Sequence, residues 1–304
     1  MPGDAGDHRP RTRVRRVDDR LGLAVLRVPL SARTLVTYAR DHVTVRTPSR
    51  PTYHDGNTLD LESPPAPASL AGWVDRFVDT VAQLGARHVQ LRWEEPLAAD
   101  EDPAPRPADD LAAAAAALGL TLTPHVVLLL DTLAVPAVAP ARLEPVAAPS
   151  AVPGGAVDRR WHAATVLYRY EAQHPGPDGW RDWDEEAVAW RVEVQRELAG
   201  EQRARVWLAS RHGAPVGRLT LTHDRQGLAA VHDLVVHPVH RRLGVGAALA
   251  HAAVAARLDV DPDARVGAAV ALGSPALRLA RRLGLRPHAL VWTARGPVPS
   301  SRGS

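Results

Sequence analysis

The chain contains no cysteine and no lysine among its 304 residues. Without cysteine it cannot build disulfide scaffolds, thiolate zinc sites, iron–sulfur clusters or a cysteine nucleophile. Without lysine it has neither Schiff-base chemistry nor the lysine of a P-loop. Because all 37 strongly basic residues are arginines, they stay charged to very high pH, which agrees with a pI of about 9.9 at a net charge of only +3.

Long apolar runs are also scarce. Residues 1–20 are rich in arginine and lack the apolar run of a secretory signal, so we expect a disordered basic tail. The tail has no interleaved aromatic residues and is interrupted by Asp18 and Asp19, which argues against a nucleic-acid partner. The apolar stretch 111–130 is broken by Gly119 and Pro124, which argues against a membrane span. These features favour a cytoplasmic protein.

The length and a hydrophobic fraction of 45% predict two domains, 21–138 and 141–298, joined by a proline-rich segment. The first is expected to hold strands at 22–28, 43–47, after residue 57, 88–93 and 121–130, and helices at 32–40, 67–84 and 111–118. The second is expected to hold strands at 142–146, 206–211, 216–223, 228–237, 266–272 and 289–295, and helices at 158–171, 183–198, 244–258 and 275–283.

A short internal repeat links the two domains. Leu118-Gly119-Leu120, followed by Pro124-His125, is echoed by Leu283-Gly284-Leu285, followed by Pro287-His288. Each copy lies between a predicted helix and a predicted strand. We therefore interpret the two halves as distant copies of one α/β unit.

The stretch 231–249, VHDLVVHPVHRRLGVGAAL, is the most informative part of the sequence. It predicts a strand, a turn with two arginines and two glycines, and then a helix. The first N–H groups of a helix have no intrahelical partner and carry the positive end of its dipole, so this turn can hold a pyrophosphate against bare backbone. A Walker loop is absent, and Leu249 stands where a dinucleotide fingerprint needs its third glycine.

This RxxGxG turn, preceded by Val235-Val236-His237-Pro238, resembles the acetyl-CoA motif of the GNAT acetyltransferase superfamily. The resemblance covers residues 142–297 and implies a mixed, mostly antiparallel sheet flanked by helices, preceded by a smaller degenerate copy at 21–138. It further implies that the main chain of Leu234, Val235 and Val236 binds the pantetheine arm, where the fourth strand of the fold splays from the fifth. The implied pyrophosphate loop comprises Arg241, Arg242, Leu243, Gly244, Val245, Gly246 and Ala247.

The resemblance also suggests residues for the chemistry. His232 stands on the fourth strand, where some relatives place a base, and an imidazole titrates near neutrality; a merely structural histidine is the alternative. Asp233 is expected on the opposite face. We expect no metal site, because strand alternation and the turn spread His232, His237 and His240 apart.

Two departures from the family pattern bear on the mechanism. Gly273 stands where many relatives have asparagine, so the hydroxyl of Ser274 is the expected substitute in cofactor binding. Ala280 stands where many have a tyrosine general acid, so Tyr168, Tyr170 or solvent must serve instead. The first half has no RxxGxG between residues 58 and 75 and is not expected to bind coenzyme A. An acceptor pocket is expected from Trp161, Tyr168, Trp180, Trp183 and Trp190, with core packing as the alternative.

The resemblance implies an enzyme that moves an acetyl group from acetyl-CoA to an amine of a small molecule or a protein, without a metal. One alternative is a non-catalytic acyl-CoA-binding module, and another is a tandem acetyltransferase similar to mycothiol synthase. The sequence leaves a homodimer open.

Overall fold

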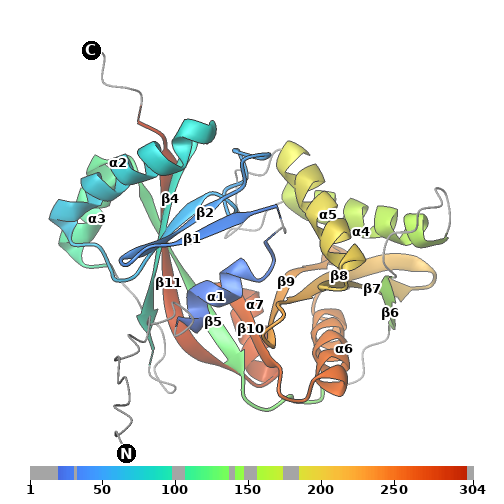
Figure 1. Ribbon diagram of the computed structural model, residues 1–304. Helices are drawn as coiled ribbons and strands as arrows, with labels where there is room; N and C mark the ends of the chain where they lie inside the picture. Colours follow the sequence, from blue (N-terminus) through green and yellow to red (C-terminus); the bar gives the residue numbers. More distant parts are fainter. Residues whose placement is uncertain are drawn as a thin grey trace, which may run out of the picture.

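The computed structural model describes residues 20–30, 33–97, 107–136, 141–146, 156–173 and 185–299. These residues form one mixed sheet of eleven strands with helices on both faces (Figure 1). Residues 1–19 and the loop at 174–184, with Trp180 and Trp183, lie outside the described residues. Among the described helices, none is long and apolar enough to cross a membrane.

The first half begins with two elements that differ from expectation. Residues 21–27 form a helix rather than a strand, and residues 35–38 form a strand rather than part of a helix. The remaining predicted elements of this half are confirmed. The elements are α1 (Leu21–Arg27), β1 (Leu35–Tyr38), β2 (His42–Arg46), β3 (Thr58–Leu61), α2 (Leu70–Thr80), β4 (His88–Pro96), α3 (Asp109–Ala117) and β5 (Thr121–Leu130).

All ten elements predicted for the second half are present, with ends shifted by a few residues. The terminal strand is longer than predicted. The elements are β6 (Arg142–Val146), α4 (Ala156–Gln173), α5 (Glu185–Gly200), β7 (Ala204–Arg211), β8 (Ala214–His223), β9 (Leu228–Val236), α6 (Val245–Val260), β10 (Arg265–Ala271), α7 (Pro275–Arg282) and β11 (Leu285–Pro297).

The two halves exchange a strand at the centre of the sheet. The strand order is β1-β2-β3-β4-β11-β5-β10-β9-β8-β7-β6. Strand β11 of the second half thus lies between β4 and β5 of the first, and β5 lies between β11 and β10, all antiparallel. Outside this centre, β3 pairs in parallel with β4 and β9 in parallel with β10. Both halves therefore repeat one topology, which agrees with the internal repeat in the sequence.

The helices form two layers around this sheet. Helices α2, α3, α6 and α7 share one large apolar core, with members such as Phe77 and Leu249. On the opposite face, α1 places Leu23 and Val25 against Val127 and Val291 of the central strands. Helix α4 packs Trp161 against β6 and β7 on that same face. The face under α1, α4 and α5 also carries most of the polar groups described below.

Candidate active site

Strands β9 and β10 diverge, as the family resemblance implies. Their parallel pairing includes only residues 228–230 of β9 and 265–267 of β10. Beyond this point β9 stays paired with β8 on its other side as far as Val236. Val235 is buried, whereas Leu234 and Val236 are half-buried. The edge of β9 predicted to bind pantetheine therefore faces away from β8, on the side where β10 departs.

The turn after β9 leads into the N-terminus of α6. Arg242 and Gly244 adopt left-handed conformations, with φ of 62° and 79°. The N–H of Ala248 donates to the carbonyl of Gly244 at 3.0 Å, so the N–H groups of the preceding helical residues have no partner inside the helix. Arg241 steadies the turn, because its Nε donates to the carbonyl oxygen of Val236 at 2.9 Å. This arrangement fits the predicted anion cradle.

Gly246 keeps open the space beside the β9 edge. A Cβ at this position would lie 3.5 Å from Leu279 and 3.6 Å from both Leu234 and Val236. These neighbours come from α7 and from the half-buried end of β9, so a larger side chain would enter the gap between the two elements. A methyl group would make only ordinary van der Waals contacts here, so it is a branched side chain such as valine that would crowd the space beside the end of β9. No cluster of side chains suited to a metal ion occurs among the described residues.

Ser274 lies at the N-terminus of α7. Its Oγ accepts a hydrogen bond from the N–H of Leu277 at 3.3 Å and caps the helix. The hydroxyl is buried in this role, and its predicted contact with the cofactor stays a prediction. Ala280, farther along α7, is buried in the large core.

His232 and Asp233 contact each other, contrary to the expectation that they lie on opposite faces. Asp233 has a φ of 51°, and the β8–β9 register shifts beside it, so the strand bulges and alternation breaks. As a result the His232 Nδ1 lies 2.8 Å from Asp233 Oδ2. The His232 Nε2 lies 3.2 Å from Thr222 Oγ1. The imidazole side chain is 15% exposed.

Helices α4 and α5 surround the Asp233 carboxylate. Tyr168 Oη donates to Oδ1 at 3.4 Å, and Gln195 Nε2 donates to Oδ2 at 2.5 Å. Arg191 Nη2 lies 3.4 Å from Oδ1. Burial favours the neutral acid, but the charges of Arg191 and the His232 ring outweigh it and hold the pKa of Asp233 far below its usual range. Burial raises the pKa of Tyr168, so this phenol stays protonated.

The first half of the chain reaches this site through the loop before β3. Asp55 Oδ2 accepts from Arg191 Nη1 at 3.0 Å, so one guanidinium bridges Asp55 and Asp233. Next to it, the rings of Tyr53 and Trp190 lie 3.9 Å apart between centroids. Sequence reasoning did not identify Asp55, Arg191 or Gln195, because no local pattern marks them.

The aromatic residues predicted for the acceptor pocket divide into three groups. Trp161 is completely buried in the core between α4 and the sheet, so its predicted place in the pocket is wrong. Trp190 packs on Tyr53, which matches the core alternative. Tyr168 donates a hydrogen bond to the Asp233 carboxylate, so it lies in the candidate site. Tyr170 stacks on His237, with ring centroids 5.1 Å apart.

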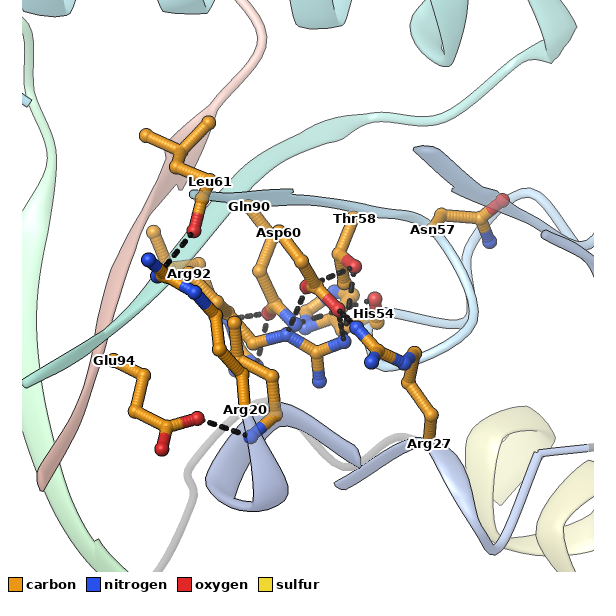
Figure 2. A network of polar contacts seen from close by, with 12 residues as sticks. Arg20, Arg27, His54, Asn57, Thr58, Asp60, Leu61, Gln90, Arg92 and Glu94 are labelled. Atoms are coloured by element: carbon orange, nitrogen blue, oxygen red, sulfur yellow. Dashed lines mark hydrogen bonds and ion pairs between the residues drawn. The ribbon is translucent and has the colours of Figure 1, made fainter. Parts of the chain in front are cut away.

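The first half holds a buried ionic network of its own, between the sheet and α1. Figure 2 shows Arg92 between β3 and α1, where its Nε donates to Asp60 Oδ1 at 2.7 Å. Arg27 of α1 donates to Asp60 Oδ2 at 2.9 Å, and Arg92 Nη2 donates to Thr58 Oγ1 at 3.0 Å. The two arginines hold the pKa of Asp60 below its usual range in spite of its burial. The absence of coenzyme A binding by the first half stays a prediction.

The diverging strands, the glycine turn and the N-terminus of α6 together form the candidate site. Residues 169–285, which make up most of the second half, match the model of the acetyltransferase (GNAT) family. No curated protein matches the chain in sequence.

Solved structures resemble the whole chain, and not only its second half. A GCN5-related N-acetyltransferase from Kribbella flavida has a TM-score of 0.57 at 18% identity, covering 94% of this chain and 95% of its own. A conserved protein of unknown function from Staphylococcus epidermidis has a TM-score of 0.63 at 12% identity, covering 86% of this chain and 92% of its own. At these identities the likeness concerns the fold. It extends over both halves, so the first half shares the GNAT-like fold.

Proposed function

We propose that the protein transfers an acetyl group from acetyl-CoA to an amine of a small molecule or a peptide. The observation that carries the proposal is the diverging edge of β9, which ends at the glycine turn and the N-terminus of α6. Main-chain groups of residues 234–236 would align the pantetheine arm, and those of 241–247 would hold the pyrophosphate.

In the proposed reaction the neutral amine attacks the thioester carbon. Backbone N–H groups of β9 stabilise the oxyanion of the tetrahedral intermediate, which collapses to the amide and the thiolate of coenzyme A. His232 accepts the proton that the amine loses, at Nε2, because Asp233 holds Nδ1. The 3.2 Å contact to Thr222 is the longer of the two ring contacts and must open for this step. Since Ala280 offers no hydroxyl, the thiolate takes its proton from solvent.

A second candidate is a module that binds acyl-CoA without turning it over. Two observations favour it: both ring nitrogens of His232 contact protein groups, and Ala280 replaces an acid with a methyl group. Binding and turnover measured on the same protein separate the two candidates.

The test combines calorimetry with acetyl-CoA and a thiol-release assay on a panel of amines. We expect Gly246→Val to weaken acetyl-CoA binding at least tenfold, because its side chain enters the gap beside Leu234. Gly72→Val on α2, where a Cβ meets no atom within 4 Å, is the matched control and should bind normally. His232→Gln should bind acetyl-CoA normally and lose about tenfold or more in turnover at neutral pH. Absence of binding by the unaltered protein refutes both candidates, and binding without turnover leaves the module.

A further inference from the structure

The GNAT-like first half reaches the candidate active site through a chain of ion pairs. Arg191 of α5 uses Nη1 for Asp55 of the first half, at 3.0 Å, and Nη2 for Asp233 of the second half, at 3.4 Å. Asp233 in turn contacts the His232 ring at 2.8 Å. An unbroken series of charged contacts therefore runs from the loop before β3 to the imidazole.

We propose that Asp55 is a positioning residue through which the first half sets the charge around His232. The inference rests on the proposed function for its catalytic meaning. Arg191 carries one positive charge and contacts two carboxylates. Because Asp55 offsets part of that charge, Arg191 neutralises Asp233 less than it would without Asp55. The imidazole of His232 therefore lies next to a more negative carboxylate. A more negative neighbour stabilises the protonated ring and orients its Nδ1–H.

The burial of the participants makes this sharing effective. The side chain of Asp233 is 6% exposed and that of Arg191 is 17% exposed, so solvent screens their interaction weakly. Asp55 is 35% exposed, yet Arg191 holds the pKa of Asp55 at about 2 against the effect of desolvation. Asp55 thus stays ionised at every pH at which the enzyme would work.

Other charged or titratable groups face the same site and stay unchanged in the test. Arg218 of β8 and Tyr168 of α4 lie against Asp233, and Tyr53 of the first half lies near Arg191. Arg218 Nη2 donates to Gln195 Oε1 at 2.7 Å, which fixes the amide beside Asp233. None of these groups joins the two halves through a direct ion pair.

A second ion pair between the halves supplies the matched control. Arg50 Nη2 lies 3.2 Å from Glu193 Oε2, two residues along α5 from Arg191, and both side chains are exposed. Like the Asp55 pair, it ties the same loop to the same helix. Among the described residues, however, Glu193 pairs with Arg50 and makes no polar contact with Asp233 or His232.

The experiment follows the His232 ring by NMR in the full chain labelled with ¹³C-histidine, with its signal assigned by loss in His232→Gln. We expect Asp55→Asn to move the titration midpoint of this signal to lower pH by about half a unit, because Arg191 then neutralises Asp233 more fully. Arg191→Gln should move it to higher pH by a similar amount. Glu193→Gln should leave it in place.

Opposite shifts in Asp55→Asn and Arg191→Gln support the proposal, because a general loosening of the interface would move both variants, and Glu193→Gln, in one direction. Equal shifts, or no shift in either, overturn it. The pH profile of acetyl transfer is recorded in parallel, and its acid limb should move with the NMR midpoint. If the midpoint moves while the protein turns over no thioester, the proposed function fails and the coupling between the halves stands.

Discussion

Asp60 lies between two arginines in the interior of the first half. Its side chain is fully buried, and those of Arg27 and Arg92 are 9% and 2% exposed. Arg27 comes from α1 and Arg92 from β4, so the carboxylate joins the helix to the sheet. Burying three charges is costly unless each is paired, and here a single acid compensates two cations.

Replacing Asp60 with asparagine should therefore destabilise the protein severely. Two buried guanidinium groups would lose their counter-charge, and we expect the free energy of unfolding to fall by about 3–5 kcal/mol. Asp131→Asn is the matched control, because its ion pair with Arg286 is 56% and 64% exposed; its loss should cost less than about 1 kcal/mol. Urea unfolding of both variants makes the comparison, and equal losses would contradict it.

At this scale the sequence predicted the residues that lie close together in the chain. The turn from Arg241 to Ala247 could be predicted because its shape depends on local backbone conformation at its glycines. The contacts of Asp233 could not, because they depend on a bulge and on Arg191 and Asp55, which lie far away in sequence. Contacts between residues so far apart in sequence depend on the register in which the strands pair, which the local sequence does not specify.

Among the elements, two assignments were wrong because contacts with distant parts of the chain decide the structure of both segments. The segment 21–27, LGLAVLR, is a short apolar run, and a run of seven residues fits a buried strand and a helix equally well. Packing of Leu23 and Val25 on the central strands decides for the helix. Strand β1 is exposed along its length and has no burial pattern, so only its pairing with β2 identifies it.

Strands β5 and β11, which the two halves exchange, each follow a glycine turn, and the two turns differ in the space around the glycine. Gly119 precedes β5 and Gly284 precedes β11, with φ of 69° and 91°. A Cβ at Gly284 would lie 1.8 Å from the carbonyl oxygen of Thr132, whereas one at Gly119 would meet no atom within 4 Å. The chain thus turns into β11 directly against the end of β5.

Alanine at these two glycines should separate conformational strain from collision. Both variants adopt a disfavoured φ, which costs about 1–2 kcal/mol. In Gly284→Ala the free energy of unfolding should fall by about 1–3 kcal/mol more, because the backbone at Thr132 must move to admit the methyl group. Thermal and urea unfolding provide the measurement. Equal losses of unfolding free energy in the two variants would contradict this prediction, because they would show that the backbone at Thr132 moves aside at no cost.

For the molecule as a whole, the central exchange makes the halves depend on each other. The antiparallel pairing of β11 extends along both β4 and β5, and the large core includes helices from both halves. Composition and the internal repeat predicted two related halves, and the structure has them. The exchange itself was not predictable from composition, since either half could have paired its own strands.

Separate expression of residues 20–138 and 139–299 tests this dependence. We expect neither piece to unfold cooperatively alone, because each exposes a long strand edge that the other covers. A full chain cut at a protease site within 137–140 is the control and should keep a single transition. A cooperative transition in the isolated second half, with normal affinity for acetyl-CoA, would show that β5 is dispensable.

The position of β11 also has a consequence for biosynthesis. As the nascent chain leaves the ribosome, β4 and β5 emerge long before residues 285–297, the strand that separates them in the finished sheet. Until residues 285–297 have been synthesised, the first half cannot complete its part of the sheet. A premature stop just before β11 would therefore damage the part of the protein that was made first.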